Sequence, residues 1–167
     1  MRWLLPALGV VIVFVLLGGA IFGLSGRLGA APEQPVAFPH DVHVKGVGLD
    51  CTFCHRTATT GDAAGIPSVE QCMFCHRVVG QGNPEIEKVR QAGQNQSPID
   101  WIKVHRLPDS VHFTHAPHIR AGVACATCHG QVEGMKQARQ VRDLRMGDCV
   151  SCHRQNNATT DCAACHY

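Results

Sequence analysis

The stretch FTHAPHIRAGVACATCHG, residues 113–130, brings three histidines and two cysteines together in a short piece of chain. It ends in a Cys-x-x-Cys-His run, Cys125 to His129, which is the attachment signal of c-type haem. Two thiols separated by two residues bond the two vinyl groups of the porphyrin, and the next residue presents an imidazole to the iron. Such a run needs one histidine, so His115 and His118 require a separate explanation.

The Cys-x-x-Cys-His run occurs five times and accounts for all ten cysteines of the 167-residue chain. A disulfide framework would not need a histidine after every second cysteine, and a zinc site would usually combine two pairs at finger-like spacing. We therefore predict five haem c groups. The predicted covalent attachment points are Cys51, Cys54, Cys72, Cys75, Cys125, Cys128, Cys149, Cys152, Cys162 and Cys165. The predicted proximal iron ligands are His55, His76, His129, His153 and His166.

Five haems on so short a chain would replace side chains as the apolar interior, which agrees with an aromatic content of only 5%. The formal net charge of +2 omits the haem propionates, and much of the Arg and Lys content is needed to pair with them. We expect a mostly irregular and helical fold. It would comprise a single transmembrane helix and a small multihaem cytochrome c domain, in which short helices surround a haem core.

The amino-terminal segment carries no charge from Trp3 to Gly26 and is long enough to cross a bilayer as a helix. A cleaved signal peptide is the alternative, but its apolar core would be shorter. We expect a transmembrane anchor over residues 1–26 with a cytoplasmic amino terminus. Haem is attached to c-type cytochromes outside the bacterial cytoplasmic membrane, so the haem domain of a single-pass protein would lie on the periplasmic side.

The rest of the chain shows an internal repeat. Each of two Phe-x-His-x-x-His segments is followed by a pair of haem runs, and the fifth run is an addition at the carboxyl end. The expected parts are a linker over 27–37, a pentahaem domain over 38–167, repeats at 38–77 and 113–154, a connecting segment at 78–112 and the last haem run at 162–166.

Three short helices are expected inside this domain. Residues 83–93 have Asn at the N-cap, Pro at the first helical position and Gly at the end. A capping box at Ser68 to Gln71 predicts a helix that carries the second haem run. A third helix is expected over 132–145 from its spaced apolar residues.

Six histidines remain after the proximal ligands are assigned. An iron that only transfers electrons favours six-coordination, which needs a distal ligand opposite the proximal one. Five irons can therefore all have two histidine ligands, with one histidine left over. The six candidates are His40, His43, His105, His112, His115 and His118.

The Phe-x-His-x-x-His segments, set seven or eight residues before a haem run, resemble the class III multihaem cytochromes c. In that family the first histidine binds the nearby haem and the second reaches another. The resemblance implies that His40 serves the first haem and His115 the third. His43 and His118 would then cross to other haems.

The connecting segment carries a second resemblance. DWIKVHRLP, residues 100–108, leads into Val111-His112-Phe113, and Met146-Gly-Asp-Cys149 follows later. These motifs are similar to the pentahaem membrane-anchored cytochrome subunit of alternative complex III and to the multihaem subunit of related quinone reductase complexes. In those relatives an aromatic residue often holds the position of His112, so the resemblance implies His105 as the fifth distal ligand and His112 as the surplus histidine.

By this resemblance the chain is an electron-transfer subunit without bond chemistry of its own. It would pass electrons from menaquinol oxidation through five haems to a periplasmic cytochrome, a blue-copper protein or an oxidase, in a respiratory or photosynthetic chain. Implied partners are the membrane, an iron-sulfur or molybdopterin-like subunit, integral quinone-site subunits and a soluble or tethered acceptor. Nucleic acid is not among them.

Two other functions remain open from the sequence. A self-sufficient membrane-anchored quinol dehydrogenase would need one haem with an open or weakly held sixth position, against which the surplus of histidines argues. A multihaem reductase of a small oxyanion would need an open iron in a pocket with acid and base residues. No haem run departs from Cys-x-x-Cys-His in a way that suggests such an iron.

Overall fold

The computed structural model describes residues 12–19 and 31–167 and divides the chain into two units, Met1–Ala30 and Ala31–Tyr167. In the first unit, residues 12–19 are helical and exposed. The second unit contains every cysteine and every histidine of the chain.

The expected transmembrane helix over residues 1–26 is corrected by the structure. A bilayer span needs about 20 consecutive apolar helical residues. Within residues 12–19 and 31–167, no helix is both long and apolar enough to cross a membrane. The rest of the expected anchor, residues 1–11 and 20–26, lies outside the described residues, as do residues 27–30 of the expected linker.

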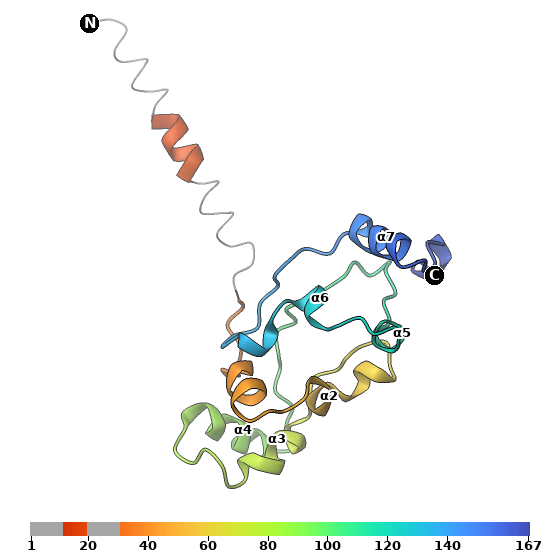
Figure 1. Ribbon diagram of the computed structural model, residues 1–167. Helices are drawn as coiled ribbons and strands as arrows, with labels where there is room; N and C mark the ends of the chain where they lie inside the picture. The colour runs from red at the N-terminus through yellow and green to blue at the C-terminus, as the bar shows by residue number, and fades with distance from the viewer. Residues whose placement is uncertain (1–11, 20–30) are drawn as a thin grey trace, which may run out of the picture. The chain divides into compact units, whose positions relative to one another are not determined.

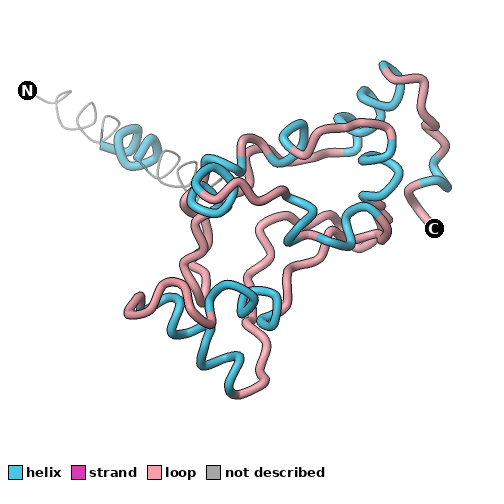
Figure 2. Tube along the Cα trace, turned by 60° about the horizontal axis from the view of Figure 1, so that its bottom comes forward, coloured by secondary structure: helices cyan, strands magenta, loops and turns pink. Residues whose placement is uncertain are grey.

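The second unit consists of short helices joined by long irregular segments (Figure 1). Loops and turns make up much of the second unit, and no strand occurs in the described residues (Figure 2). The elements are η1 (Val42–Gly46), α2 (Cys51–Cys54), η2 (Arg56–Thr59), α3 (Val69–His76), α4 (Pro84–Gln94), α5 (His115–Arg120), α6 (Ala126–His129), η3 (Val132–Gly134), α7 (Met146–Gln155) and η4 (Cys162–Ala164).

The helix expected over 83–93 is confirmed as α4. The side chain of Asn83 accepts a hydrogen bond from the backbone N of Glu85 at 2.9 Å, and Pro84 occupies the first turn. The helix expected after Ser68 is confirmed as α3, but the Ser68 side chain makes no capping hydrogen bond to the backbone. The predicted capping box is therefore wrong in detail, although the helix begins where it was expected.

The helix expected over 132–145 is wrong. Only the 3-10 turn η3 forms there, and the chain is irregular from Met135 until α7 begins at Met146. Basic residues occur at every third position from Lys136 to Arg145. Like charges at this spacing repel one another on a helix, so the apolar pattern is not sufficient to form one.

The apolar core of the unit is small. The buried hydrophobic residues of the described part are Val36, Ala58, Val69, Val89 and Ala116. Three of them form one cluster where α3 packs against α4, with partly buried residues such as Trp101 around it. Large apolar side chains elsewhere are exposed, for example Val78 at 73%. The polypeptide therefore supplies little of its own interior.

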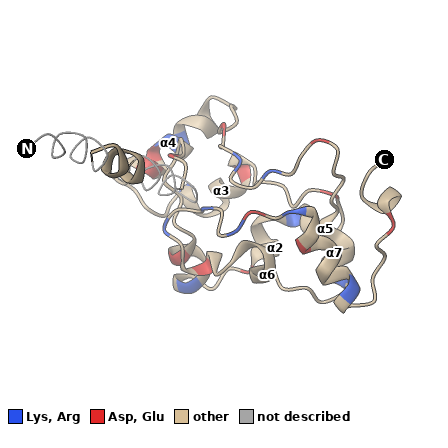
Figure 3. Ribbon diagram, turned by 90° about the horizontal axis from the view of Figure 1, so that it is seen from above, with Lys and Arg blue, Asp and Glu red and all other residues tan. Residues whose placement is uncertain are grey.

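Charged residues are distributed over many elements rather than collected on one (Figure 3). Helix α7 shows a regular arrangement, with Asp148 in its first turn and Arg154 in its last turn. Opposite charges at these ends complement the helix dipole, which stabilises the element that carries the fourth haem run.

Candidate haem sites

Each of the five Cys-x-x-Cys-His runs lies on or beside one short helical turn. The first run is on α2, the second at the end of α3, the third on α6, the fourth on α7 and the fifth on η4. One helical turn places residues three apart on the same face, so both thiols of a run point to the same side. Asp50 and Asp161 begin the first and fifth turns, and their carboxylates accept backbone hydrogen bonds at 2.8 and 3.1 Å.

Three predicted proximal histidines face a predicted distal histidine. A metal–imidazole bond is about 2.0 Å long, so two imidazoles on opposite sides of one metal ion have ring centroids roughly 6 Å apart. The observed separations are 6.0 Å for His43 and His76, 6.2 Å for His115 and His129, and 5.9 Å for His118 and His153. The ring spacing of these three pairs fits one iron between each pair.

Seven predicted iron ligands share a hydrogen-bond pattern that determines which ring nitrogen is free to bind a metal. In seven predicted ligands, Nδ1 donates to a backbone carbonyl oxygen. Metal-binding histidines commonly donate their second ring N–H in this way, which orients the ring and leaves Nε2 for the metal. The seven are His43, His55, His76, His115, His118, His153 and His166.

His40 lies close to the first haem run. Burial and then the charges of His55 and His43 lower the pKa of His40, so its imidazole is neutral near pH 7. Its Nδ1 is buried and has no hydrogen-bond partner. A buried ring nitrogen without a partner is unusual, and a neutral imidazole is the form that binds a metal. These features agree with His40 as a ligand, which stays a prediction.

His105 does not lie beside the fifth haem run. Its ring meets that of His129 edge-on, with centroids 4.4 Å apart and an interplanar angle of 85°. Nε2 of His105 is 3.4 Å from Nδ1 of His129. Burial, followed by the charges of His105, His115 and His55, lowers the pKa of His129 to about 4. His105 thus lies on the Nδ1 side of the third proximal histidine, His129. No sequence signal indicated this relationship.

His112 instead lies beside the fifth haem run. Its ring stacks on Tyr167 with centroids 4.2 Å apart, and its backbone N donates to the carbonyl oxygen of Cys165 at 2.8 Å. His166 donates its Nδ1–H to Ser110 O at 2.8 Å. Within residues 31–167, no histidine ring pairs with His166 at the spacing seen for the second, third and fourth runs. No distal histidine is therefore assigned to the predicted fifth haem.

The thiols of different runs approach one another. Burial and then the charge of Cys54 raise the pKa of the Cys72 thiol, so these thiols of the first and second runs are close enough to interact electrostatically. Burial and then the neighbouring Cys125 raise the pKa of Cys51, which brings the first and third runs together.

Thiols of neighbouring haem runs also influence one another towards the carboxyl end. Burial, then Asp148, then Cys165 and Cys128 raise the pKa of Cys149. The fourth run therefore lies near both the third and the fifth. Across the unit the helices that carry the runs follow one another as α3, α2, α6 and α7 (Figure 1).

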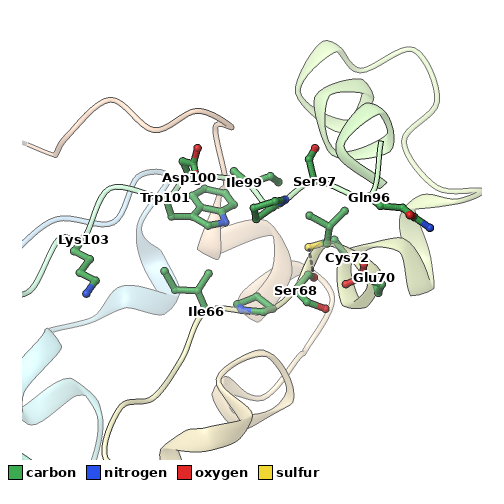
Figure 4. Close-up of a pocket in the computed structure, with 13 residues that line it drawn as sticks. Ile66, Ser68, Glu70, Cys72, Gln96, Ser97, Ile99, Asp100, Trp101 and Lys103 are labelled. Carbon is green, nitrogen blue, oxygen red and sulfur yellow. Dashed lines mark hydrogen bonds between the residues drawn. The ribbon is translucent and has the colours of Figure 1, made fainter. Parts of the chain in front are cut away.

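A cavity of about 470 Å³ opens beside the second run. Cys72 lines it together with Ile66, Ile99 and Trp101, as Figure 4 shows. This mixture of one haem-run thiol with aliphatic and aromatic side chains suits the edge of a flat apolar macrocycle. Trp101 was noted in the sequence only as part of a motif, and its place in this cavity was not predicted.

The residues present fit haem c. Paired thiols lie on single helical turns, three histidine pairs have the spacing of two ligands on one iron, and apolar side chains exceed what the small core covers. Together these features define a cytochrome of the multihaem c type.

The comparisons with known proteins agree with this class. Residues 25–106 match the class III cytochrome c family, and residues 111–167 match the family described as cytochrome c7 and related cytochrome c. Both matches are to multihaem cytochromes c, whose cofactor is c-type haem, and together they span most of the chain.

The chain is also similar to a protein of Nitratidesulfovibrio vulgaris (strain Hildenborough) named menaquinone reductase, multihaem cytochrome c subunit. The two are 29% identical over 161 residues, covering 80% of this chain and 77% of the relative. The narrower resemblance to alternative complex III has no support in these comparisons.

Proposed function

We propose that this chain carries five c-type haems and is the electron-transfer subunit of a membrane quinone oxidoreductase complex. The observation that carries the proposal is the set of three histidine pairs with ring centroids about 6 Å apart. Two imidazoles on one iron leave no position for a substrate, which suits electron transfer rather than bond chemistry.

The chain's own residues would hold and tune the cofactors, while haem supplies one-electron chemistry when bound. Backbone carbonyls orient seven of the eleven histidines, so little movement of the ligands is expected between redox states. Most of the remaining polypeptide wraps the cofactors in loops, as the small apolar core suggests.

The succession of neighbouring thiols supports an electron route in the order second, first, third, fourth and fifth run. The second run, beside the cavity lined by Trp101, and the fifth run, at the carboxyl end, would be the two ends. Partners that deliver or remove electrons would then dock near these ends.

The partners follow from the relative, whose name places it in a menaquinone reductase. On this proposal the chain exchanges electrons with quinone-site and iron-sulfur or molybdopterin-like subunits of a membrane complex. A cytochrome, a blue-copper protein or an oxidase would be the other redox partner. The relative's name indicates electron flow towards menaquinone, whereas the sequence resemblance implied menaquinol oxidation. The haem domain would lie on the outer side of the cytoplasmic membrane, where c-type haem is attached.

The proposal is tested by purifying the chain both alone and with its membrane partners. Mass spectrometry should find five covalently attached haems in each preparation. A menaquinol analogue should exchange electrons with the haems only in the complex, because the isolated chain has no quinone chemistry of its own. Absence of covalent haem would reject the proposal.

A second candidate is a self-sufficient quinol dehydrogenase with one open haem. The observation that favours it is that His166 has no facing histidine ring in the described part of the chain. Carbon monoxide binds an open ferrous iron, so an optical titration of the isolated chain would reveal one. Menaquinol oxidation by the isolated chain would establish this function in place of the first.

A further inference from the structure

His129 differs from the other predicted proximal ligands in the partner of its second ring nitrogen. The other four proximal histidines each donate Nδ1–H to a backbone carbonyl oxygen, at distances between 2.5 and 3.2 Å. His129 has a side chain there instead: Nε2 of His105 lies 3.4 Å from its Nδ1. His105 comes from the connecting segment, 24 residues earlier in the chain.

The tautomer of His129 follows from its predicted role. Nε2 of His129 must carry a lone pair to bind iron, so the proton of the neutral ring is on Nδ1. Nδ1–H can then donate only to an acceptor, and Nε2 of His105 is within reach. The edge-on ring contact, at an interplanar angle of 85°, is compatible with an N–H that points at a neighbouring lone pair.

The same placement removes His105 from the set of plausible distal ligands. The predicted partner of His129 at the iron is His115, whose ring is nearly parallel to that of His129 with centroids 6.2 Å apart. His105 lies on the Nδ1 side, and its own Nε2 is already directed at His129. A nitrogen that accepts this proton cannot bind another iron at the same time.

We propose that His105 is a positioning residue of the third haem site, whose Nε2 accepts the Nδ1–H of His129 and holds that imidazole in line with His115. This inference rests on the proposed function, because it requires a haem at Cys125–His129. A hydrogen bond from Nδ1–H makes a histidine a stronger electron donor to its metal. It therefore stabilises ferric iron and lowers the potential of one haem out of five.

The test uses the holoprotein of full length with His105→Ala and His105→Gln. Haem content is measured first, followed by low-temperature EPR and an optical redox titration. His105→Ala is expected to leave the number of low-spin haems unchanged and to raise the midpoint potential of one haem. His105→Gln retains an acceptor oxygen and is expected to restore part of that shift. Arg106→Lys, a neighbouring exposed change that keeps the charge, is the matched control and should leave all potentials unchanged.

A new high-spin haem in both His105 variants would overturn the inference, because it would identify His105 as a distal ligand. Unchanged potentials in His105→Ala would also overturn it, because His129 would then not depend on His105. If the His105→Ala protein does not bind five haems, the His105→Gln protein is compared with the wild type instead. The EPR spectra and the redox titrations then decide whether the inference holds. Wild-type protein without covalent haem would instead reject the proposed function, so the two failures are distinguishable.

Discussion

The imidazole ring of His115 lies parallel to that of His129, with centroids 6.2 Å apart and planes that differ by 10°. His115 begins α5 and is held from a distant part of the chain, since both its backbone N and its Nδ1 donate to Asp62 O, at 3.0 and 2.8 Å. Asp62 follows the first haem run. The loop between the first two runs therefore positions the predicted distal ligand of the third.

Replacing His115 by Ala is expected to convert one of the five haems from low-spin to high-spin, because the iron at His129 would lose its sixth ligand. EPR and carbon monoxide binding measure this change. Arg120→Lys, an exposed change at the last residue of α5 that keeps the charge, is the matched control and should leave all five haems low-spin. If His115→Ala left all five haems low-spin, the pairing with His129 would be contradicted.

His43 is expected to serve the second haem rather than the first. Its ring centroid lies 6.0 Å from that of His76, and Phe38 stacks on the His43 ring with centroids 4.3 Å apart. His43→Ala should create one high-spin haem, and His40→Ala should create a different one with its own EPR signal. The double variant should therefore show two high-spin haems. A single high-spin haem in the double variant would mean that both histidines act on the same iron.

The sequence resemblance implied that the second histidine of each Phe-x-His-x-x-His segment reaches a haem other than the nearby one. It did not indicate which haem. Spacing to the next haem run indicates that a histidine is available, while the pairing of His118 with His153 depends on how α5 and α7 fold together. The structure shows these pairs, and their role as ligands stays a prediction. Similarly, α4 was predictable because Asn83 and Pro84 are local signals.

The wrong helix prediction over 132–145 also has a physical cause. The apolar spacing over 132–145 predicted a helix, but repeated basic residues oppose one. The sequence resemblance implied His105 as the fifth distal ligand, and a resemblance cannot distinguish an iron ligand from the hydrogen-bond partner of another ligand. Only the distance from His105 to His129 separates these two cases.

Val89→Ala is expected to destabilise the α3–α4 part of the protein by about 2 kcal/mol, because it removes two buried carbon atoms and leaves a small cavity. Val89 is 6% exposed and packs with Val36 and Val69. Val47→Ala, at a site that is 65% exposed, is the control and should change stability little. Denaturant unfolding of the holoprotein measures both. Equal effects would show that the haems rather than this cluster determine stability.

Gly130→Ala is expected to perturb the third haem site. Gly130 directly follows His129 and has φ 71° and ψ −167°, a conformation that is costly for any residue with a side chain. A Cβ there would also lie 2.9 Å from Cγ1 of Val141, so the total cost should be roughly 2–4 kcal/mol.

Gly122→Ala separates backbone strain from crowding. Gly122 has φ 79°, but a Cβ there would meet nothing within 4 Å. Its expected cost is about 1 kcal/mol, from backbone strain alone. Unfolding curves and the haem EPR spectrum should therefore show a larger change for Gly130→Ala. A change of equal size in both variants would contradict a role for the contact with Val141.

Removal of the third haem is expected to divide the proposed electron route. The third run lies between the first and the fourth, since Cys51 neighbours Cys125 and Cys149 neighbours Cys128. A double change of Cys125 and Cys128 to Ala prevents attachment there and should leave four haems in two groups. After rapid photochemical reduction, electron exchange between these groups should become slower than in the wild type.

The matched control removes an end of the route instead of its middle. A double change of Cys162 and Cys165 to Ala also leaves four haems, but these should remain one connected group, with electron exchange as fast as in the wild type. Mass spectrometry confirms the haem content of both variants, and the absorbance decay after the reducing flash gives the rates. Equally slow exchange in the two variants would contradict the order, because the third haem would then occupy no more central a position than the fifth.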